Sequence, residues 1–147
     1  MPRPYASGVI EVAVDQVWNT LKNFGNIAAL ATAIEHSELI GEAGVGAVRR
    51  LTLGDGAKLE ERLVALDELS MTLAYEIVGA NPFNVRRYVA TVRVSPVTDT
   101  GGSFVEWWAE FDADAAAEVD LVKLFSDDVF ADVIAGLRSQ LKSVSRN

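Results

Sequence analysis

Hydrophobic residues recur at every third or fourth position through the last part of the chain. Residues 118–143 contain no proline, and apolar side chains at this spacing form one face of an amphipathic helix. The apolar stripe consists of Val122, Phe125, Val129, Val133, Leu137 and Leu141. The pattern therefore predicts one continuous helix over 118–143 that buries this face against another layer of structure.

Upstream of this helix, apolar and polar residues alternate with a period of two in several short runs. Alternation of this kind is typical of strands with one buried face. The first run covers 9–14, where Ile10, Val12 and Val14 alternate with other residues. Further strands are predicted over 35–40, 47–53, 58–66, 72–78, 86–94 and 103–112, with turns rich in glycine, aspartate and asparagine between them.

Two short helices are expected after the first strand. Asp15 is of the residue type that caps a helix, and Trp18 and Leu21 follow it on one side. The segment Asn23–Asn26 ends this helix, and a second short helix is expected over 27–33.

The turn Gly54-Asp55-Gly56 sets the register of one hairpin. A three-residue turn pairs Leu51 with Leu59 and Arg49 with Glu61, so that leucines share one face and most charged residues share the other. A one-residue slip would mix the two sets. This register places Arg49 and Glu61 on the apolar, inward face. The same parity carried onward places inside Leu63, Ala65, Leu73, Tyr75, Ile77, Tyr88, Ala90, Val92, Val94, Val105, Trp107, Ala109 and Phe111.

A long amphipathic helix that follows a run of antiparallel strands is best buried when the sheet curls around it. We therefore expect an α+β helix-grip fold. Its curved antiparallel sheet of about seven strands would wrap around a long C-terminal helix, with two short helices after the first strand. The length of 147 residues favours a single ligand-binding domain over 1–147. Small inward residues such as Ala90 would leave a cavity between the sheet and the helix.

The composition narrows the classes of function. There are 21 Asp and Glu residues against 13 Lys and Arg residues, and the net charge of -8 argues against nucleic-acid partners and anionic membrane surfaces. The absence of cysteine excludes disulfides, thiol nucleophiles and thiolate metal sites. No apolar run is long enough for a membrane span, and the N-terminus does not have the pattern of a signal peptide. A cytoplasmic protein is the expectation.

Several short phrases carry a resemblance over nearly the whole chain. They are Val17-Trp18, Phe24-Gly25-Asn26, the glycine-rich segment from Gly44 to Arg49, Glu61-Arg62-Leu63 and Val105-Glu106-Trp107. Together with the order of elements, they resemble the polyketide cyclase/dehydrase-like branch of the START and birch-pollen-allergen superfamily. The resemblance implies a helix-grip fold, and its members include cyclases and carriers of ligands. Where such proteins often have a Trp-His-Pro-like turn that lines the cavity, this chain has Leu30-Ala31-Thr32.

The inward pair Arg49 and Glu61 is the sharpest candidate for chemistry. A single buried charge is costly, so each of these residues needs a partner. In a catalytic interpretation Glu61 is a general base, Arg49 stabilises an oxyanion and Tyr88 offers a hydroxyl. A structural ion pair within the sheet is the alternative, and it remains open. The residues predicted to bind a ligand are Leu51, Leu63, Tyr75, Ile77, Ala90, Trp107, Phe125 and Val129.

No cofactor and no metal are expected. His36 is the only histidine, and no triad or metal-ligand spacing surrounds it. Two functions remain open: a carrier or sensor that binds a hydrophobic small molecule, or an enzyme of the cyclase, dehydratase or aromatase type that acts on a polyketide-like carbonyl compound. Trp108 is expected to point outward beside Glu106 and Glu110, which favours a contact surface and a homodimer.

Overall fold

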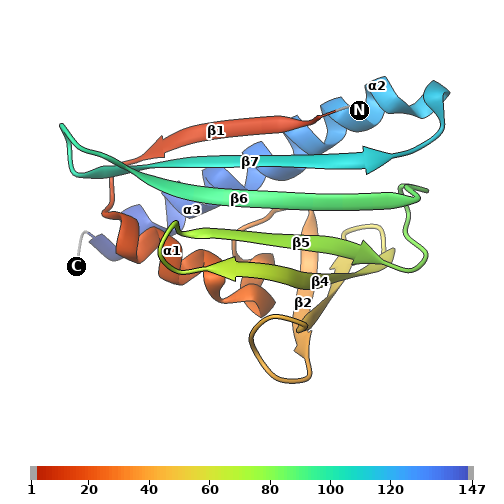
Figure 1. The fold of residues 1–147 in the computed structure, drawn as a ribbon, viewed down its shortest axis with the longest axis horizontal. Helices are drawn as coiled ribbons and strands as arrows, with labels where there is room; N and C mark the ends of the chain where they lie inside the picture. Colours follow the sequence, from red (N-terminus) through yellow and green to blue (C-terminus); the bar gives the residue numbers. More distant parts are fainter. Residues whose placement is uncertain (1–2, 146–147) are drawn as a thin grey trace.

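The computed structural model describes residues 3–145 (Figure 1). In chain order the elements are β1 (Tyr5–Ile10), α1 (Val14–Lys22), the 3₁₀ helix η1 (Phe24–Ala29), β2 (Ile34–Ile40), β3 (Val48–Leu53), β4 (Lys58–Asp67), β5 (Thr72–Val78), β6 (Arg87–Val97), β7 (Gly102–Asp112), α2 (Ala115–Lys123), the π-helical segment η2 (Leu124–Phe130) and α3 (Ala131–Ser145).

The strands form one antiparallel sheet with the order β1-β7-β6-β5-β4-β3-β2. Consecutive strands pair as hairpins from β2 to β7, while β1 joins the far edge beside β7. Helix α3 runs behind β7 and β6, and β2 is turned steeply relative to β7 (Figure 1). This is the expected α+β helix-grip fold, with a curved sheet around the C-terminal helix.

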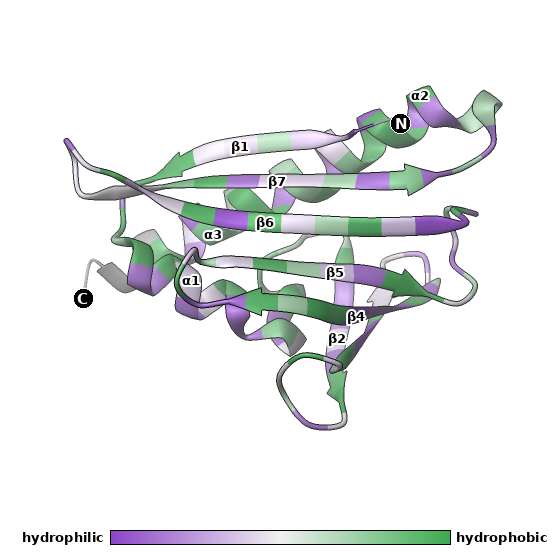
Figure 2. Ribbon diagram, viewed as in Figure 1, coloured by the Kyte–Doolittle hydropathy of each residue, from purple (hydrophilic) through white to green (hydrophobic). Residues whose placement is uncertain are grey.

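Alternation along the strands separates a buried face from an exposed one. In β6 and β7, hydrophobic and hydrophilic residues alternate along each strand (Figure 2). The cross-strand pairs Tyr88 with Phe111, Ala90 with Ala109 and Val92 with Trp107 all lie on the buried side. The predicted parity of this hairpin is confirmed.

The hairpin between β3 and β4 also has the predicted register. Arg49 pairs with Glu61 and Leu51 pairs with Leu59, and the backbone N–H of Leu53 donates to the carbonyl of Ala57 at 2.8 Å. Between Leu63 and Ala65, a bulge in the pairing of β4 with β5 interrupts the alternation of inward and outward residues. It leaves Ala65 exposed, so the expectation that Ala65 faces inward is wrong.

The first strand lies earlier than predicted, at Tyr5–Ile10 instead of 9–14. A Cβ atom at Gly8 would approach the side chains of Ile134 and Arg138 to 2.9 Å. Glycine is usually unfavourable within a strand, but here it lets α3 pack closely against β1. Helix α1 then begins at Val14, and the carbonyl of Ala13 accepts from the N–H of Gln16 at 3.1 Å. Asp15 therefore lies inside the first turn and is not the cap.

The second short helix also begins earlier than predicted, because η1 starts at Phe24 instead of at residue 27. Strand β2 holds it in place through Ser37. The Ser37 hydroxyl donates to the carbonyl of Gly25 at 2.8 Å and accepts from the N–H of Ala28 at 3.0 Å. Glycine is needed at position 25 because a Cβ atom there would lie 2.9 Å from that of Leu39.

The C-terminal helix runs from Ala115 to Ser145, as predicted for 118–143, but η2 in its middle is π-helical. Phe125 and Phe130 are both fully buried although they are five residues apart. Val129, which belongs to the predicted stripe, is only half-buried. Within residues 3–145, no helix combines the length and the apolar composition that crossing a membrane requires.

Candidate functional site

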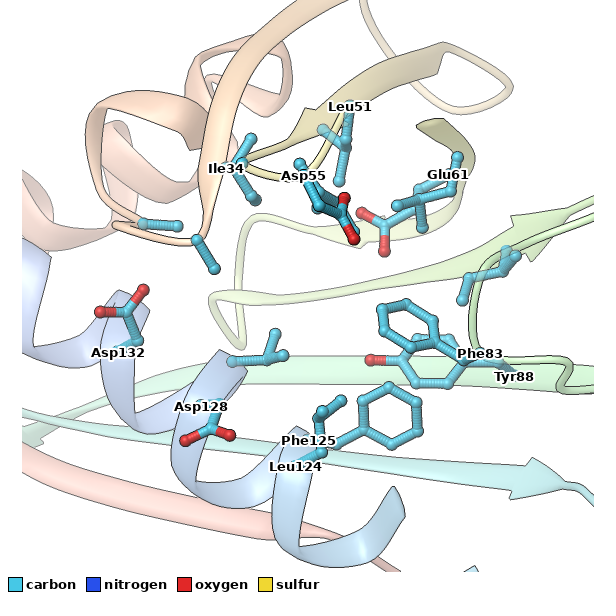
Figure 3. Close-up of a pocket in the computed structure, with 17 residues that line it drawn as sticks. Ile34, Leu51, Asp55, Glu61, Phe83, Tyr88, Leu124, Phe125, Asp128 and Asp132 are labelled. Atoms are coloured by element: carbon cyan, nitrogen blue, oxygen red, sulfur yellow. The ribbon is translucent and has the colours of Figure 1, made fainter. Parts of the chain in front are cut away.

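A cavity of about 460 Å³ lies between the β3–β4 hairpin, the β5–β6 loop and η2 (Figure 3). Its polar lining residues are Asp55, Glu61, Tyr88, Asp128 and Asp132. The remaining lining residues are apolar or glycine: Ala31, Ala33, Ile34, Leu51, Leu53, Gly54, Leu59, Ile77, Phe83, Leu124, Phe125 and Val129.

Aromatic rings close one side of this cavity. The ring of Phe125 meets those of Phe83 and Tyr88 edge to face, with centroids 5.2 and 5.0 Å apart. Phe83 comes from the loop between β5 and β6, where the side chain of Asn81 accepts from the N–H groups of Phe83 and Val85 at 3.1 and 3.2 Å. The loop is therefore held in a defined shape, which keeps Phe83 over the cavity.

Glu61 is the most buried charged group on the cavity lining. Its strand position faces inward, and Arg49 is the residue directly opposite on β3. The Nε atom of Arg49 donates to Oε1 of Glu61 at 2.8 Å, and Nη2 lies 2.8 Å from the same oxygen. The predicted inward pair is confirmed as two neighbours on adjacent strands.

Arg49 itself lies behind Glu61 and does not line the cavity. Its Nη1 atom donates to the carbonyl of Phe24 at 3.1 Å. Its guanidinium carbon lies 4.0 Å from the ring centroid of Phe24 and 4.5 Å from that of Tyr75, a cation–π arrangement. Arg49 as an oxyanion stabiliser in contact with a substrate has no support in this geometry.

The second carboxylate oxygen of Glu61 faces open space. Both contacts with Arg49 go to Oε1, and no hydrogen bond from residues 3–145 reaches Oε2. Within residues 3–141, every side-chain polar atom that is fully enclosed has a hydrogen-bond partner. Oε2 has none, so it is not fully enclosed and is accessible from the cavity. Burial raises the pKa of the Glu61 carboxyl above its ordinary value, and the charge of Arg49 offsets part of that rise. A largely buried carboxyl group with a raised pKa therefore borders the cavity.

Tyr88 places its hydroxyl in the same cavity (Figure 3). Burial, together with Tyr75 and Glu61 nearby, raises the pKa of this hydroxyl well above its ordinary value. Tyr88 is therefore a neutral phenol under ordinary conditions. It acts as a hydrogen-bond donor or acceptor and does not act as a base.

Half of the predicted ligand-binding residues line this cavity and half do not. Leu51, Ile77, Phe125 and Val129 belong to its lining. The others that were expected to line it, Leu63, Tyr75, Ala90 and Trp107, are buried elsewhere.

Packing explains why three of these residues lie away from the cavity. Trp107 stacks on Phe130 with ring centroids 5.8 Å apart, and its Nε1 atom donates to the hydroxyl of Tyr75 at 3.1 Å. No hydrogen bond within residues 3–141 joins the Tyr75 hydroxyl to Arg49 or Glu61, and Tyr75 meets Arg49 through its ring instead. Leu63 borders a separate hollow of about 350 Å³ with Phe24 and Leu39.

Three carboxylates of the cavity lining were not predicted from the sequence: Asp55, Asp128 and Asp132. Asp55 and Asp128 are exposed, and Asp132 is half-buried, so these residues mark the mouth of the cavity. Asp132 ties the segment between η1 and β2 to the last helix, because its carboxylate accepts from the N–H and the hydroxyl of Thr32, each at 2.8 Å. Of these three, only Asp55 belongs to a sequence motif, Gly54-Asp55-Gly56, and that motif predicted a turn and not a binding site.

The outward position expected for Trp108 can be checked in the structure. Trp108 faces outward and is half-buried, with the guanidinium carbon of Arg3 5.4 Å from its ring centroid. Within residues 3–145, no group of three or more His, Asp or Glu side chains is arranged to hold a metal ion.

Comparison with known proteins gives one family and several similar folds. The family described as polyketide cyclase / dehydrase and lipid transport matches residues 1–146. The structure of XoxI from Bacillus cereus is 25% identical, with a TM-score of 0.86 over 99% of each chain. Norcoclaurine synthase from Thalictrum flavum, solved with dopamine and hydroxybenzaldehyde, is 15% identical, with a TM-score of 0.79 over 96% of this chain and 86% of that one. At that identity the likeness shows the fold alone.

A curated relative matches part of the sequence. It is Ribonuclease 1 from Panax ginseng, which is 33% identical over 84 residues, covering 53% of this chain and 54% of the relative. The match thus spans about half the length of that curated relative.

Proposed function

Because the chain belongs to the polyketide cyclase / dehydrase and lipid transport family, we propose that it binds a hydrophobic, lipid- or polyketide-like small molecule as a cytoplasmic carrier or sensor. The observation that carries this proposal is the cavity of about 460 Å³ with its mostly apolar lining. Ligand sites of proteins fall in this range of volume and combine apolar walls with a few polar groups.

The inner polar groups fit the end of such a molecule. Oε2 of Glu61 offers an acceptor, and the hydroxyl of Tyr88 offers a donor or an acceptor. Removing a ligand hydroxyl from water is costly unless it finds partners of this kind. The proposed ligand therefore carries a hydroxyl, or another neutral hydrogen-bond donor, at its inner end.

A neutral fluorescent probe tests this proposal. Nile red should gain fluorescence on binding to the wild-type protein, and Val129→Trp should abolish the gain because Val129 lines the cavity. Val119→Trp is the matched control, since Val119 is 80% exposed on α2 and does not line the cavity. Circular dichroism checks that both variants are folded.

Equal binding of Nile red by the wild type and a folded Val129→Trp variant would show that the cavity is not the site. Native mass spectrometry of the purified protein supplies a second readout, because a tightly held ligand would add a discrete mass. That mass should be absent from Val129→Trp and present in Val119→Trp.

The open oxygen of Glu61 favours a second candidate function, an enzyme of the cyclase, dehydratase or aromatase type. Its raised pKa suits a general base that removes a proton next to a carbonyl, while the neutral hydroxyl of Tyr88 donates a hydrogen bond to the carbonyl oxygen on which negative charge develops. Arg49 would hold Glu61 in position from behind. Under this candidate, Glu61→Gln should bind a polyketide-like carbonyl compound and fail to convert it, whereas a pure carrier converts nothing in either form.

Two finer parts of the proposal concern partners. A homodimer through the face of Trp108 is supported by its outward position and is tested by light scattering of wild type and Trp108→Ala.

The activity named for the ginseng relative is not carried over. No lysine, arginine or histidine lines the cavity, and the net charge of -8 is unfavourable for a polyanion such as RNA.

A further inference from the structure

The charged residues that line the cavity are all of one sign. The lining contains the carboxylates of Asp55, Glu61, Asp128 and Asp132, and no lysine, arginine or histidine. Ligand pockets usually hold only a few polar groups, and these fix the chemistry of the ligand. The negative charge of the lining therefore favours ligands of some charges over others.

Only one of the four carboxylates is balanced by a cation. Glu61 lies against Arg49, whereas Asp55, Asp128 and Asp132 form no ion pair with any side chain of residues 3–141. Asp55 accepts from the N–H of Ala57 at 2.9 Å, and Asp132 is bound by Thr32; these are neutral donors that leave the negative charge in place. The mouth of the cavity is thus negatively charged, while the inner end is close to neutral.

The carboxylates alone would not define a site, but the cavity holds an independent sign of a ligand. Glu61 is only 6% exposed, yet its Oε2 atom has no hydrogen-bond partner in residues 3–145 and faces the cavity. Because Oε2 is accessible from the cavity, the donor group of a ligand can reach it. Hydrogen bonds to an ionised carboxylate are among the stronger ones in proteins.

We infer that the natural ligand is an apolar amine: its body fills the cavity, a neutral donor reaches Oε2 of Glu61, and a protonated amino group stays at the mouth beside Asp55, Asp128 and Asp132. This inference rests on the proposed function and adds the charge of the ligand to it. Fatty acids and other apolar carboxylates are excluded, because their charge would lie among carboxylates with no cation to receive it.

The amino group belongs at the mouth, not at the inner end. Moving an ammonium group into the interior removes its hydration, and Glu61 already has Arg49 as its counter-charge. At the mouth the ammonium group keeps part of its water and meets three carboxylates that lack a cation. A neutral hydroxyl or amide donor is the group that the inner end can accept.

A series of ligands matched in length tests the inference. Dodecylamine, dodecanol and dodecanoate share one apolar chain and differ in charge, and each is used below its micelle concentration to displace Nile red. We expect dodecylamine to bind most tightly, dodecanol about five- to tenfold more weakly and dodecanoate more weakly still, since partly exposed charge pairs have modest energies. The advantage of the amine should shrink at an ionic strength of about 1 M, where the Debye length is about 3 Å.

A pair of double variants separates the mouth from the net charge of the protein. Asp55→Asn with Asp128→Asn removes two mouth charges, and an asparagine oxygen still accepts from the N–H of Ala57. Asp120→Asn with Asp127→Asn removes the same number of charges from exposed positions on α2 and η2 that do not line the cavity. The mouth variant should lose the preference for amine over alcohol, and the control should keep it.

The outcomes distinguish the two proposals. If neither Nile red nor dodecanol binds, the proposed function fails. If both bind but dodecylamine binds no better than dodecanol, or dodecanoate binds as well, the cavity is a ligand site and the inference of an amine is overturned. Equal loss of the preference in both double variants also overturns it, because the net charge would then explain the effect.

Discussion

At the β1–β7 end of the sheet the last helix packs closely on the strands, whereas at the β3–β4 end a cavity separates the helix from the strands. Against β1 and β7 the contact is dense: Trp107 stacks on Phe130, and Gly8 brings α3 close to its strand. Against the β3–β4 hairpin, η2 and the strands enclose about 460 Å³. Both ends belong to the same sheet, and at both ends alternate strand residues face the last helix.

The comparison shows that inward parity alone does not make a ligand site. At the closed end, Gly8 has no Cβ atom, so the side chains of Ile134 and Arg138 can lie against β1, and large aromatic rings fill what remains. At the open end, leucine and alanine side chains are too short to meet η2 across the gap. Arg49 and Glu61 lie at the border, with the arginine packed between rings and the carboxylate open to the cavity.

The largest effect is expected at this border. Arg49→Met should lower the free energy of unfolding by about 3–5 kcal/mol, because it leaves the buried carboxylate of Glu61 without its counter-charge. The double variant Arg49→Met with Glu61→Leu should be much milder, since no charge stays buried. Urea denaturation of the three proteins measures both values. A double variant as unstable as the single one would contradict the assignment of the cost to the stranded charge.

A matched pair of leucines tests the difference between the two ends directly. Leu73 and Leu51 are each 3% exposed on strands of the same sheet, but only Leu51 lines the cavity. Leu73→Ala should cost about 3–4 kcal/mol, and Leu51→Ala about 1–2 kcal/mol less, because a wall residue already lacks contacts on one side. Equal losses in urea denaturation would mean that the two regions are packed alike.

The close approach of α3 to the Leu30 segment gives a third test. A Cβ atom at Gly136 would overlap the carbonyl oxygen of Leu30, so Gly136→Ala should destabilise by about 2 kcal/mol despite the higher helix propensity of alanine. Ser139→Ala is the control, since Ser139 is exposed on the same helix. Thermal unfolding followed by circular dichroism is sufficient. A rise in the melting temperature of Gly136→Ala would refute the tight contact.

The smallest effect is the dependence of stability on pH through Glu61. Its pKa in the folded protein is raised above the ordinary value of 4.5, so its contribution is fully present below that pH and is lost as the pH rises through the folded pKa. The stability of the wild type relative to Glu61→Gln should therefore fall as the pH rises above 4.5 and then level off. Exposed carboxylates such as Asp112 are present in both proteins and cancel. A relative stability that rises over this window would show that Arg49 outweighs burial.

Much of the sheet could be predicted from the sequence, because period-two alternation and turn residues act locally. The pairing of Arg49 with Glu61 followed from one turn and one packing argument, and the structure has it. The first strand was misplaced because Gly8 looks unfavourable for a strand until the close approach of Ile134 is known. The bulge that exposes Ala65 has no sequence signal of comparable strength.

The site was only partly predictable, for a different physical reason. Alternation tells which face a side chain occupies, and it says nothing about how far the opposite layer stands away. Alternation places Trp107 and Tyr88 on the same inward face, although one is packed under Phe130 and the other opens into the cavity. The mouth carboxylates Asp128 and Asp132 lie on the last helix, and only the tertiary structure brings them to the hairpin.

The π-helical segment also sets a limit on changes in chain length. Its wider turn accommodates an additional residue, so η2 acts as an insertion that is already built into the helix. One residue corresponds to a rotation of about 100° around the axis of an α-helix. Deleting a single residue from Leu124–Phe130 would therefore rotate the preceding turns away from the surface they now meet, while leaving α3 in register. Related sequences that keep both the cavity wall and the closed end must preserve the number of residues here, even where they change every side chain.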